Sequence, residues 1–275
     1  MAERNIPLIP FLKWAGGKRW LVRSIGNLFP RTPVGTYFEP FLGGASVFAS
    51  LRPTDAVLSD INGELINVYR QVKAHWRAIA TGLNEMQERH SRTYYYNIRE
   101  TQTSDPLQRA LNFIYLNRTC YNGLYRVNLR GQFNVPIGTK SNVVLSNDDF
   151  KEWASALRKV KLLESDFEQM INMACKGDLI FADPPYTVLH NQNCFLKYNE
   201  VLFSWHDQAR LAEVLRQADR RGVTIIATNA NHASVRALYE EHFSVMTVSR
   251  ASTIAASSGK RGLYEEIIIR SRGES

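Results

Sequence analysis

Short apolar runs alternate with longer stretches of helical spacing at both ends of the chain, and turn residues bound each run. Short, unbroken apolar runs are typical of strands buried on both faces of a parallel sheet. The stretches between them favour helices, because their apolar positions recur every three or four residues. This alternation predicts an α/β fold. The predicted strands are residues 36–40, 56–60, 161–164, 178–183 and 223–228, and the predicted helices are 45–51, 64–85, 167–175, 206–220 and 232–241.

The last part of the chain predicts an antiparallel hairpin at the edge of the sheet. Residues 243–249 and 264–270 have strand character, and the Ser, Ala and Gly content of 250–262 predicts a mobile connection between them. Near the other end, an amphipathic helix is predicted to follow Gly17 and run to about Phe29.

In the middle of the chain the alternation stops. Helical stretches at residues 94–100 and 106–118 lead into the turn dipeptide Asn122-Gly123. We therefore predict an inserted, mainly helical subdomain with a hairpin over residues 65–150, and a catalytic domain formed by residues 1–64 and 151–275.

Charge and composition narrow the classes of function. The chain has 34 Lys and Arg against 26 Asp and Glu, a net charge of +8, which favours a polyanionic partner. No apolar run approaches the roughly 18 to 20 residues that cross a bilayer, and the first residues lack the apolar stretch of a signal peptide. Three widely spaced cysteines and the absence of paired histidine spacing argue against disulfides and metal sites. We expect a cytoplasmic protein without a metal.

The sequence Asp183-Pro184-Pro185-Tyr186 directly follows the apolar run 179–182. Ligands of open α/β sheets bind at this carboxyl end of the strands. Two prolines cannot continue the sheet, so the carbonyl groups beside Asp183 are free to face a ligand. The motif therefore places a carboxylate, a carbonyl and an aromatic ring together.

An exocyclic amine fits these groups. The Asp183 carboxylate and the Pro184 carbonyl can accept its two N–H donors while Tyr186 stacks on the heterocycle. The lone pair of the nitrogen then points towards an electrophile. A proline turn that merely ends the strand is the structural alternative.

Two further strand ends suggest a nucleoside site. Residues 38–48 predict a strand, a glycine turn at Gly43 and a helix start, which lets a ligand approach the backbone closely. The segment lacks the Gly-x-Gly-x-x-Gly pattern, so a nicotinamide dinucleotide enzyme is disfavoured. About 20 residues later the strand ends in Asp60, where an acid usually binds ribose hydroxyls. Asp60 could equally cap the helix that begins near Asn62.

Two other segments have the composition of nucleic-acid contacts. Residues 13–18, Lys-Trp-Ala-Gly-Gly-Lys, do not have the glycine spacing of a phosphate-binding P-loop. Residues 117–138 are rich in Arg, Asn, Gln and Tyr and contain no acid. Arginine suits guanine edges and phosphates, and Leu124 beside a turn could wedge between base pairs. A polar hairpin without a ligand is the alternative.

Four segments follow one another along the chain in the order typical of one family: residues 13–18, 39–48, 59–62 and 183–186. With them the chain, from Lys13 to about Ile269, resembles the DNA adenine N6-methyltransferases of the Dam type. The resemblance implies a class I S-adenosylmethionine-dependent fold, a Rossmann-like mixed sheet with helices on both faces. It implies S-adenosylmethionine as cofactor, S-adenosylhomocysteine as product and double-stranded DNA as partner. Its catalytic residues would be Asp183, Pro184 and Tyr186, and its cofactor-binding residues Trp14, Lys18, Glu39, Phe41, Gly43, Asp60 and Asp183.

The resemblance also implies how DNA would be recognised. Leu124 would intercalate, while Arg126 and Lys13 would each contact a guanine, which together imply a GATC target. The full set of implied DNA-binding residues is Lys13, Arg118, Tyr121, Asn122, Leu124, Arg126, Asn128, Arg130, Asn134 and Pro136. The loop at 252–261 matches the family only loosely.

We expect base flipping followed by direct SN2 transfer to adenine N6, with no covalent enzyme intermediate and no need for a cysteine. The alternatives are N4-cytosine methylation, which usually has Ser in place of Asp183, and adenine methylation in a different short site. A non-catalytic DNA-binding relative and a dehydrogenase are further alternatives. We expect a monomer near the nucleoid. A restriction endonuclease system, a solitary regulatory role and a phage enzyme all stay open.

Overall fold

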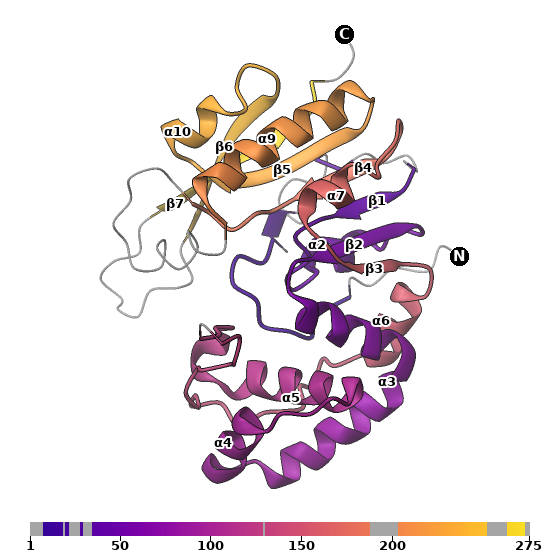
Figure 1. Ribbon diagram of the computed structural model, residues 1–275, viewed down its shortest axis with the longest axis vertical. Helices are drawn as coiled ribbons and strands as arrows, with labels where there is room; N and C mark the ends of the chain where they lie inside the picture. The colour runs from indigo at the N-terminus through magenta and orange to yellow at the C-terminus, as the bar shows by residue number, and fades with distance from the viewer. Residues whose placement is uncertain are drawn as a thin grey trace. The chain divides into compact units, whose positions relative to one another are not determined.

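The structure is a computed structural model that describes residues 8–18, 20–21, 28–29, 35–128, 130–187, 203–251 and 263–272 (Figure 1). Within these residues seven strands form a mixed sheet in the order β3-β2-β1-β4-β5-β7-β6. The expected α/β fold is confirmed, and the mixed sheet is consistent with the class I methyltransferase fold that the resemblance implied. The strands are β1 (Tyr37–Glu39), β2 (Ala56–Asp60), β3 (Lys161–Glu164), β4 (Leu179–Ala182), β5 (Thr224–Ala230), β6 (Ser244–Ala251) and β7 (Leu263–Arg270).

Most helices lie where the hydrophobic pattern predicted them. They are α2 (Ser46–Leu51), α3 (Gly63–Arg89), α4 (Arg92–Glu100), α5 (Pro106–Thr119), α6 (Phe150–Leu157), α7 (Phe167–Ile171), α9 (Trp205–Arg220) and α10 (Ala233–Ala237), with a short 3-10 turn, η1, at Tyr121–Gly123. Helix α6 was not predicted, and α7 and α10 end earlier than predicted. Most of the predicted helix that ends near Phe29 lies outside the described residues.

The chain divides into two compact units. The first unit contains Met1–Pro33 and Leu42–Glu164, and the second contains Val34–Phe41 and Ser165–Ser275. Residues 65–150 belong to the first unit, together with β2 and β3. The predicted domain boundaries at 65 and 150 stay a prediction, because compact packing does not show which segment contacts DNA.

The first unit is organised around the long helix α3. The Asn62 side chain accepts a hydrogen bond from the Leu65 N–H and so caps its start, while non-helical dihedral angles at His75 kink it. Helices α5 and α6 both pack against α3 (Figure 1). The core beneath them contains Phe11 edge-on to Trp153, with ring centroids 5.0 Å apart. This packing holds the N-terminal segment against the helices.

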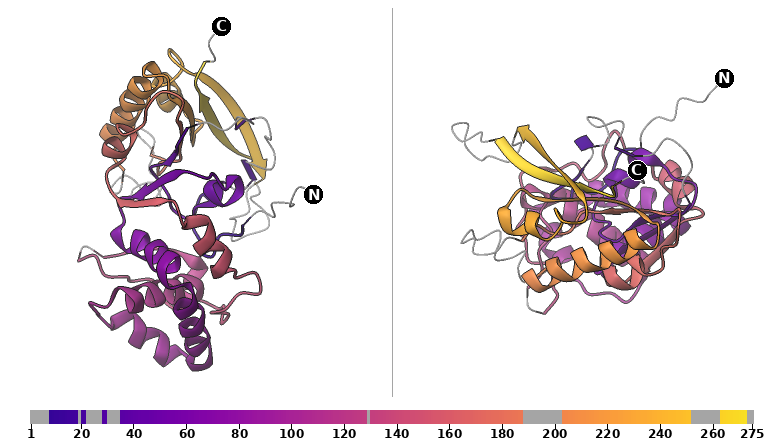
Figure 2. Two further views of the ribbon diagram at one scale, coloured as in Figure 1. Left: turned by 90° about the vertical axis from the view of Figure 1, so that its right-hand side faces the viewer. Right: turned by 90° about the horizontal axis from the view of Figure 1, so that it is seen from above.

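The second unit contains the parallel core of the sheet. Strand β4 pairs in parallel with β1 and β5, so the carboxyl ends of these three strands lie along one edge. Strand β7 then runs antiparallel to both β5 and β6, and β6 and β7 pair along their whole length (Figure 2). The predicted edge hairpin is therefore confirmed, while residues 252–262 of its predicted mobile connection lie outside the described residues.

Helix α9 covers β5 in the second unit. Its start is fixed by a capping box, in which the Ser204 hydroxyl accepts from the Asp207 N–H and the Asp207 carboxylate accepts from the Ser204 N–H. Among the described residues, no helix combines the length and apolarity needed to cross a membrane.

Candidate functional site

The Asp183–Tyr186 turn leaves the carboxyl end of β4, the place that the sequence predicted. The strand before it is buried, with each of its four residues at most 3% exposed. The register pairs Ala182 with Ala227, so Asp183 follows beside Thr228 of β5. The Thr228 hydroxyl donates to Oδ1 of Asp183 over 2.7 Å. The carboxylate is thus held by the neighbouring strand.

The backbone of the turn is held from helix α9. The Gln208 side-chain amide donates to the Pro185 carbonyl over 3.1 Å, and its own amide oxygen accepts from the Asn229 side chain over 2.9 Å. Gln208 and Asn229 are both fully buried. Just beyond the turn, the Thr187 hydroxyl donates to the Phe203 carbonyl over 2.6 Å. Buried polar groups therefore fix the path of the chain after β4.

Tyr186 is held through its hydroxyl, which donates to Oε2 of Glu266 on β7 over 3.0 Å. Glu266 is fully buried. Burial raises the pKa of Tyr186 well above its ordinary value, and the nearby charges of Asp183 and Glu266 raise it further. Tyr186 therefore stays a neutral phenol at physiological pH, with a ring suited to stacking.

Two other predicted residues follow β1 in the same unit. Glu39 is 3% exposed, and its carboxylate accepts from the Tyr37 hydroxyl over 2.8 Å. The Phe41 ring stacks on Phe167, with centroids 5.5 Å apart and planes 28° apart. It also meets the Phe203 ring edge-on at 5.5 Å. The second unit thus brings a buried carboxylate and an aromatic cluster to the strand edge that carries Asp183.

A second cluster forms in the first unit around Asp60, at the end of β2. Its Oδ2 accepts from the Gly43 N–H over 3.1 Å, and its Oδ1 accepts from the Asn62 N–H over 3.0 Å. Burial raises the pKa of Asp60, while these backbone hydrogen bonds oppose the rise. The Gly43 carbonyl in turn accepts from the Tyr69 hydroxyl over 3.0 Å. Asp60 therefore fixes the glycine turn as well as the start of α3.

Trp14 packs directly against this turn. Gly43 has a φ of +47°, and a Cβ added there would lie 2.7 Å from the Trp14 ring, so only glycine fits. The indole also stacks on Tyr125, with ring centroids 5.6 Å apart. Lys18 is 2% exposed, and its ammonium donates to the Gly16 carbonyl over 2.9 Å. Trp14, Gly43 and Asp60 are thus brought together, with Lys18 nearby in the chain.

The predicted DNA-binding segment folds as a hairpin, here called the central hairpin and comprising residues 126–128 and 130–134. The Asn134 N–H donates to the Arg126 carbonyl over 3.1 Å, and the Arg126 Nε donates back to the Asn134 side chain over 2.8 Å. Near its tip, the Asn128 carboxamide oxygen accepts from the N–H groups of Arg130 and Gln132. Arg126 and Arg130 are exposed, and two nitrogens of the Arg126 guanidinium donate to Asn134.

The turn before the central hairpin presents apolar surface. Tyr121 is 53% exposed and Leu124 is 37% exposed. Asn122 adopts a φ of +54°, and the Pro136 carbonyl accepts from the Tyr121 N–H over 2.9 Å. The hairpin with an apolar side chain beside its turn, which the sequence predicted, is therefore present.

Lys13 lies against the same turn. Its ammonium donates to the Arg118 carbonyl over 2.6 Å, and its backbone N–H donates to the Asn117 side chain over 2.8 Å. Gly123 has a φ of +64°, and a Cβ there would lie 2.7 Å from the Lys13 side chain. Burial and the charge of Lys140 lower the pKa of Lys13. The first unit thus joins Lys13 to the turn that carries Leu124.

The structure argues against the expectation that Arg118 faces DNA. Its side chain is fully buried, and both terminal nitrogens donate to Asp148 over 2.6 Å. The same guanidinium donates to the carbonyls of Phe11 and Val143. A guanidinium with this many protein partners holds the unit together and is not available to a phosphate.

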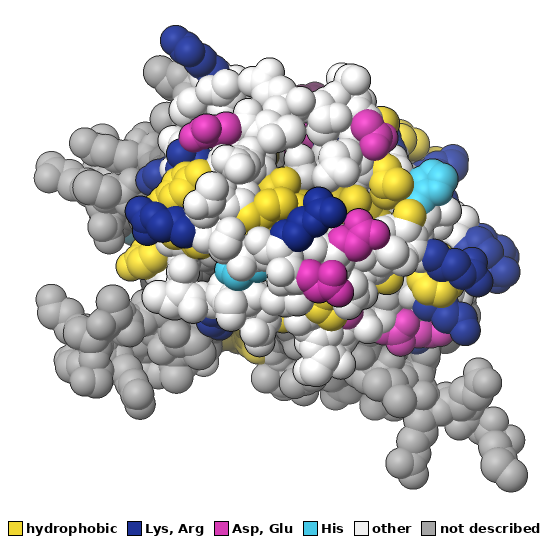
Figure 3. Space-filling model, turned by 90° about the horizontal axis from the view of Figure 1, so that it is seen from below, with side chains coloured by type: hydrophobic (Ala, Val, Ile, Leu, Met, Phe, Trp, Pro, Cys, Tyr) yellow, Lys and Arg dark blue, Asp and Glu magenta, His cyan; other side chains and the backbone are white. Residues whose placement is uncertain are grey.

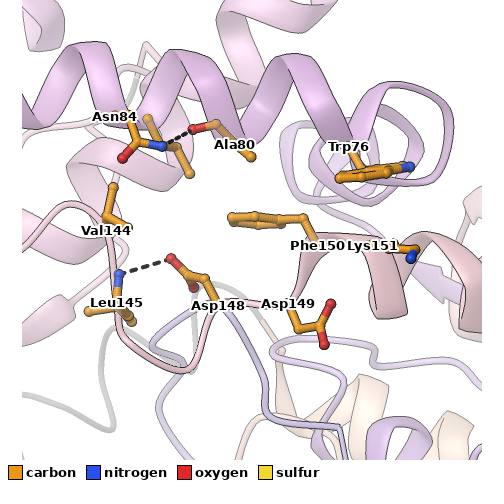
Figure 4. Close-up of a pocket in the computed structure, with 10 residues that line it drawn as sticks. Trp76, Ala80, Asn84, Val144, Leu145, Asp148, Asp149, Phe150 and Lys151 are labelled. Carbon is orange, nitrogen blue, oxygen red and sulfur yellow. Dashed lines mark hydrogen bonds between the residues drawn. The ribbon is translucent and has the colours of Figure 1, made fainter.

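A pocket next to this ion pair lies between α3 and the segment that leads into α6 (Figure 4). None of the predicted site residues lines it. The Asp148 carboxylate accepts from the Leu145 N–H over 2.9 Å and closes the loop at one wall. The pocket is lined by Trp76, Ala80, Leu83, Asn84, Val144, Leu145, Asp148, Asp149, Phe150 and Lys151. It belongs to the packing of the first unit around Asp148.

The sequence reasoning missed the residues that hold the Asp183–Tyr186 turn. Thr228 and Asn229 end an apolar run on β5, and polar residues at a strand end were the available signal. Gln208 and Glu266 gave no such signal, because they lie within a helix and a strand. Among the described residues, no group of three or more His, Cys, Asp or Glu could hold a metal ion.

Comparison with known proteins gave consistent matches. The family model for D12 class N6 adenine-specific DNA methyltransferases matches residues 14–254. The type II methyltransferase M1.LlaDCHI of Lactococcus lactis is 35% identical over 282 residues, which cover 99% of both chains. The type II methyltransferase M.MjaIII of Methanocaldococcus jannaschii is 32% identical, with 94% of this chain and 98% of that protein aligned. The DNA adenine methylase of Salmonella typhi is also 32% identical, with 94% and 93% aligned.

Proposed function

Because this chain belongs to the D12 class of N6 adenine-specific DNA methyltransferases, we propose that Asp183, Pro184 and Tyr186 hold the adenine that it methylates. The observation that supports this assignment is the Asp183–Tyr186 turn itself. It places a carboxylate, a carbonyl and a neutral phenol ring at the end of a buried parallel strand, and Thr228 holds the carboxylate from the side.

The chemistry follows from these groups. The Asp183 carboxylate and the Pro184 carbonyl accept hydrogen bonds from the two N–H groups of N6. These hydrogen bonds raise the electron density of the nitrogen as it attacks a methyl carbon. Tyr186 stacks on the base and replaces the stacking that the adenine loses when it flips out of the duplex. Placement and electrostatics supply most of the rate enhancement.

We expect the reaction to need no cysteine. Burial raises the pKa of the Cys120 thiol to about 11, so it is protonated at neutral pH and is a poor nucleophile. Cys175 is exposed, and Cys194 lies outside the described residues. We propose direct transfer, with N6 itself as the nucleophile.

The family's reaction requires a methyl donor, and S-adenosylmethionine supplies an electrophilic methyl carbon when bound. We place its nucleoside at the Asp60 cluster, because a strand-end carboxylate suits ribose hydroxyls. Trp14 packs against this cluster, and Lys18, Glu39 and Phe41 stay candidate cofactor contacts by residue type alone. Asp183 would bind donor and adenine alike.

For sequence recognition we propose that Leu124 intercalates and that Lys13 and Arg126 each read a guanine. A GATC target follows from that assignment. The exposure of Leu124 and Arg126 and the contact of Lys13 with the same turn support it. The remaining contacts to the duplex would come from Tyr121, Asn122, Asn128, Arg130, Asn134 and Pro136. Another short adenine site and N4-cytosine methylation are the competing outcomes.

We further propose that the enzyme acts as a cytoplasmic monomer and protects DNA against a partner restriction endonuclease. Two of the relatives are named type II methyltransferases, which supports this role. Others are named DNA adenine methylases, and that name leaves a solitary role open.

Methylation of an unmethylated plasmid tests the proposal. The purified protein, supplied with S-adenosylmethionine, is expected to place N6-methyladenine in GATC on both strands, mapped by sequencing that detects modified bases. The Asp183→Asn variant keeps the shape of the side chain but loses its charge, and should lose most activity. Methylated cytosine would exclude the proposed reaction, and methyladenine in another context would exclude only the proposed target.

A further inference from the structure

Buried polar side chains anchor the Asp183–Tyr186 turn at three points. Gln208, supported by Asn229, holds the Pro185 carbonyl, and Glu266 holds the Tyr186 hydroxyl. Thr228 donates to the Asp183 carboxylate over 2.7 Å, and its side chain also hydrogen-bonds Tyr186. The path of the turn, the ring and the carboxylate therefore each have a buried polar support.

We propose that Thr228 is a positioning residue for methyl transfer, whose hydroxyl fixes the orientation of the Asp183 carboxylate towards the target amine. The inference rests on the proposed function, in which that carboxylate accepts a hydrogen bond from adenine N6. It assigns to β5 a role in the reaction that the motif at the end of β4 does not reveal.

The need for such a support comes from the carboxylate itself. Rotation of an aspartate carboxyl group about its terminal torsion is broad, so the side chain alone does not set the direction of its oxygens. The 2.7 Å hydrogen bond to Oδ1 is charge-assisted, which makes it stronger than a bond between neutral groups. Because the hydrogen bond holds one oxygen, it restrains the rotation of the whole Asp183 carboxylate.

Thr228 is suited to this task by its place in the fold. It lies within β5, between two other strands, and is fully buried. Its β-branched side chain has few rotamers, and the strand backbone around it is paired on both sides. The hydroxyl is therefore held rigidly beside the first residue after β4.

The expected effect of removing the hydroxyl is confined to the chemical step. Thr228→Val keeps the shape of the side chain, and the Gln208 and Glu266 anchors still hold the turn and the ring. A misdirected acceptor weakens transition-state placement, and a displacement on the order of 1 Å costs about 100-fold in rate. We expect the single-turnover rate of methyl transfer to fall about 10- to 100-fold, while the affinity for DNA stays unchanged.

The test compares Thr228→Val, Thr228→Ala and Thr228→Ser in single-turnover methylation of a duplex with the mapped site. The Ser variant retains the hydroxyl and should restore most of the rate. Thr224→Val, which removes a hydroxyl from the first residue of the same strand, is the matched control and should behave as wild type. Thermal unfolding reports whether each variant is folded. If Thr228→Val does not fold, the comparison rests on Thr228→Ala.

The outcomes separate this inference from the proposed function. If the wild-type protein methylates adenine, and Thr228→Val and Thr228→Ala transfer the methyl group at the wild-type single-turnover rate, Thr228 does not position Asp183. If Ser is as slow as Val, the hydroxyl is not the cause and the inference also fails. If the wild-type protein methylates no adenine, the proposed function itself is wrong.

Discussion

The resemblance assigns Lys13, Arg118 and Arg126 to DNA, yet their surroundings in the structure give these three cations different roles. The Arg118 guanidinium is fully buried and paired with Asp148. The Lys13 ammonium donates to a backbone carbonyl beside the turn, and burial lowers its pKa. Arg126 is exposed on the central hairpin, where Asn134 holds its Nε. Exposure and orientation therefore separate a structural cation from a candidate for base recognition.

Replacing Arg126 should change the sequence preference. In Arg126→Ala the proposed bidentate contact to guanine is lost, and discrimination at that base pair should fall by about 1–3 kcal/mol. Binding of a panel of duplexes with single base changes measures this. Arg130→Ala is the matched comparison, since it should weaken binding to every duplex by a similar factor. Equal losses for both variants on unrelated sequences would remove the recognition role of Arg126.

At the scale of elements, one buried ion pair joins helix α5 to the loop before α6. Arg118 is the last residue but one of a helix whose start is capped by Asp105 and whose second half is buried throughout. Its guanidinium binds Asp148 and the Val143 carbonyl in that loop, and the Phe11 carbonyl in the N-terminal segment. Because three segments distant in the sequence meet on one side chain, the helix that precedes the central hairpin is held firmly in place.

Breaking this pair should destabilise the fold strongly. Arg118→Met leaves the Asp148 carboxylate, 9% exposed, without its partner, and removing one member of a buried pair costs about 3–5 kcal/mol of unfolding free energy. Arg99→Met is the control, because Arg99 pairs with the exposed Glu100 and such pairs contribute about 0–1 kcal/mol. Urea denaturation measures both variants. Similar midpoints for the two would show that the Arg118 pair does not stabilise the fold.

At the scale of the whole molecule, the charge of +8 favours DNA without defining where it binds. On the face drawn in Figure 3, basic and acidic side chains are interspersed, so this face does not present charge of a single sign. Several cations of the first unit are paired with carboxylates, among them Arg52, Arg109 and Arg118. The net charge therefore overstates how many cations can meet phosphates.

The salt dependence of DNA binding measures how many cations of the protein contact phosphates. Each phosphate neutralised contributes about −0.9 to the slope of log affinity against log salt. Arg130→Gln should make the slope about 0.9 less negative. Arg236→Gln, on α10 and paired with Glu240, should leave it unchanged. Fluorescence anisotropy titrations at several salt concentrations supply the slopes, and an unchanged slope for Arg130→Gln would place that residue away from the phosphates.

The sequence by itself determined most of the elements and the place of the motif at the end of β4. Apolar runs bounded by turn residues gave the strands, because a buried strand must be apolar on both faces, and Asp183 could be placed at the end of β4 from local order alone. The Gly43 turn and the central hairpin were also predictable, since glycine and asparagine mark backbone that other residues avoid.

Tertiary structure alone decided what surrounds these residues. Asp183 and Thr228 are 45 positions apart, and only the parallel register of β4 and β5 brings the hydroxyl to the carboxylate. Arg118 has the residue type of a phosphate contact, yet the packing of three distant segments buries it. Hydrogen-bond partners and burial depend on contacts between elements, which the periodicity of a single segment does not encode.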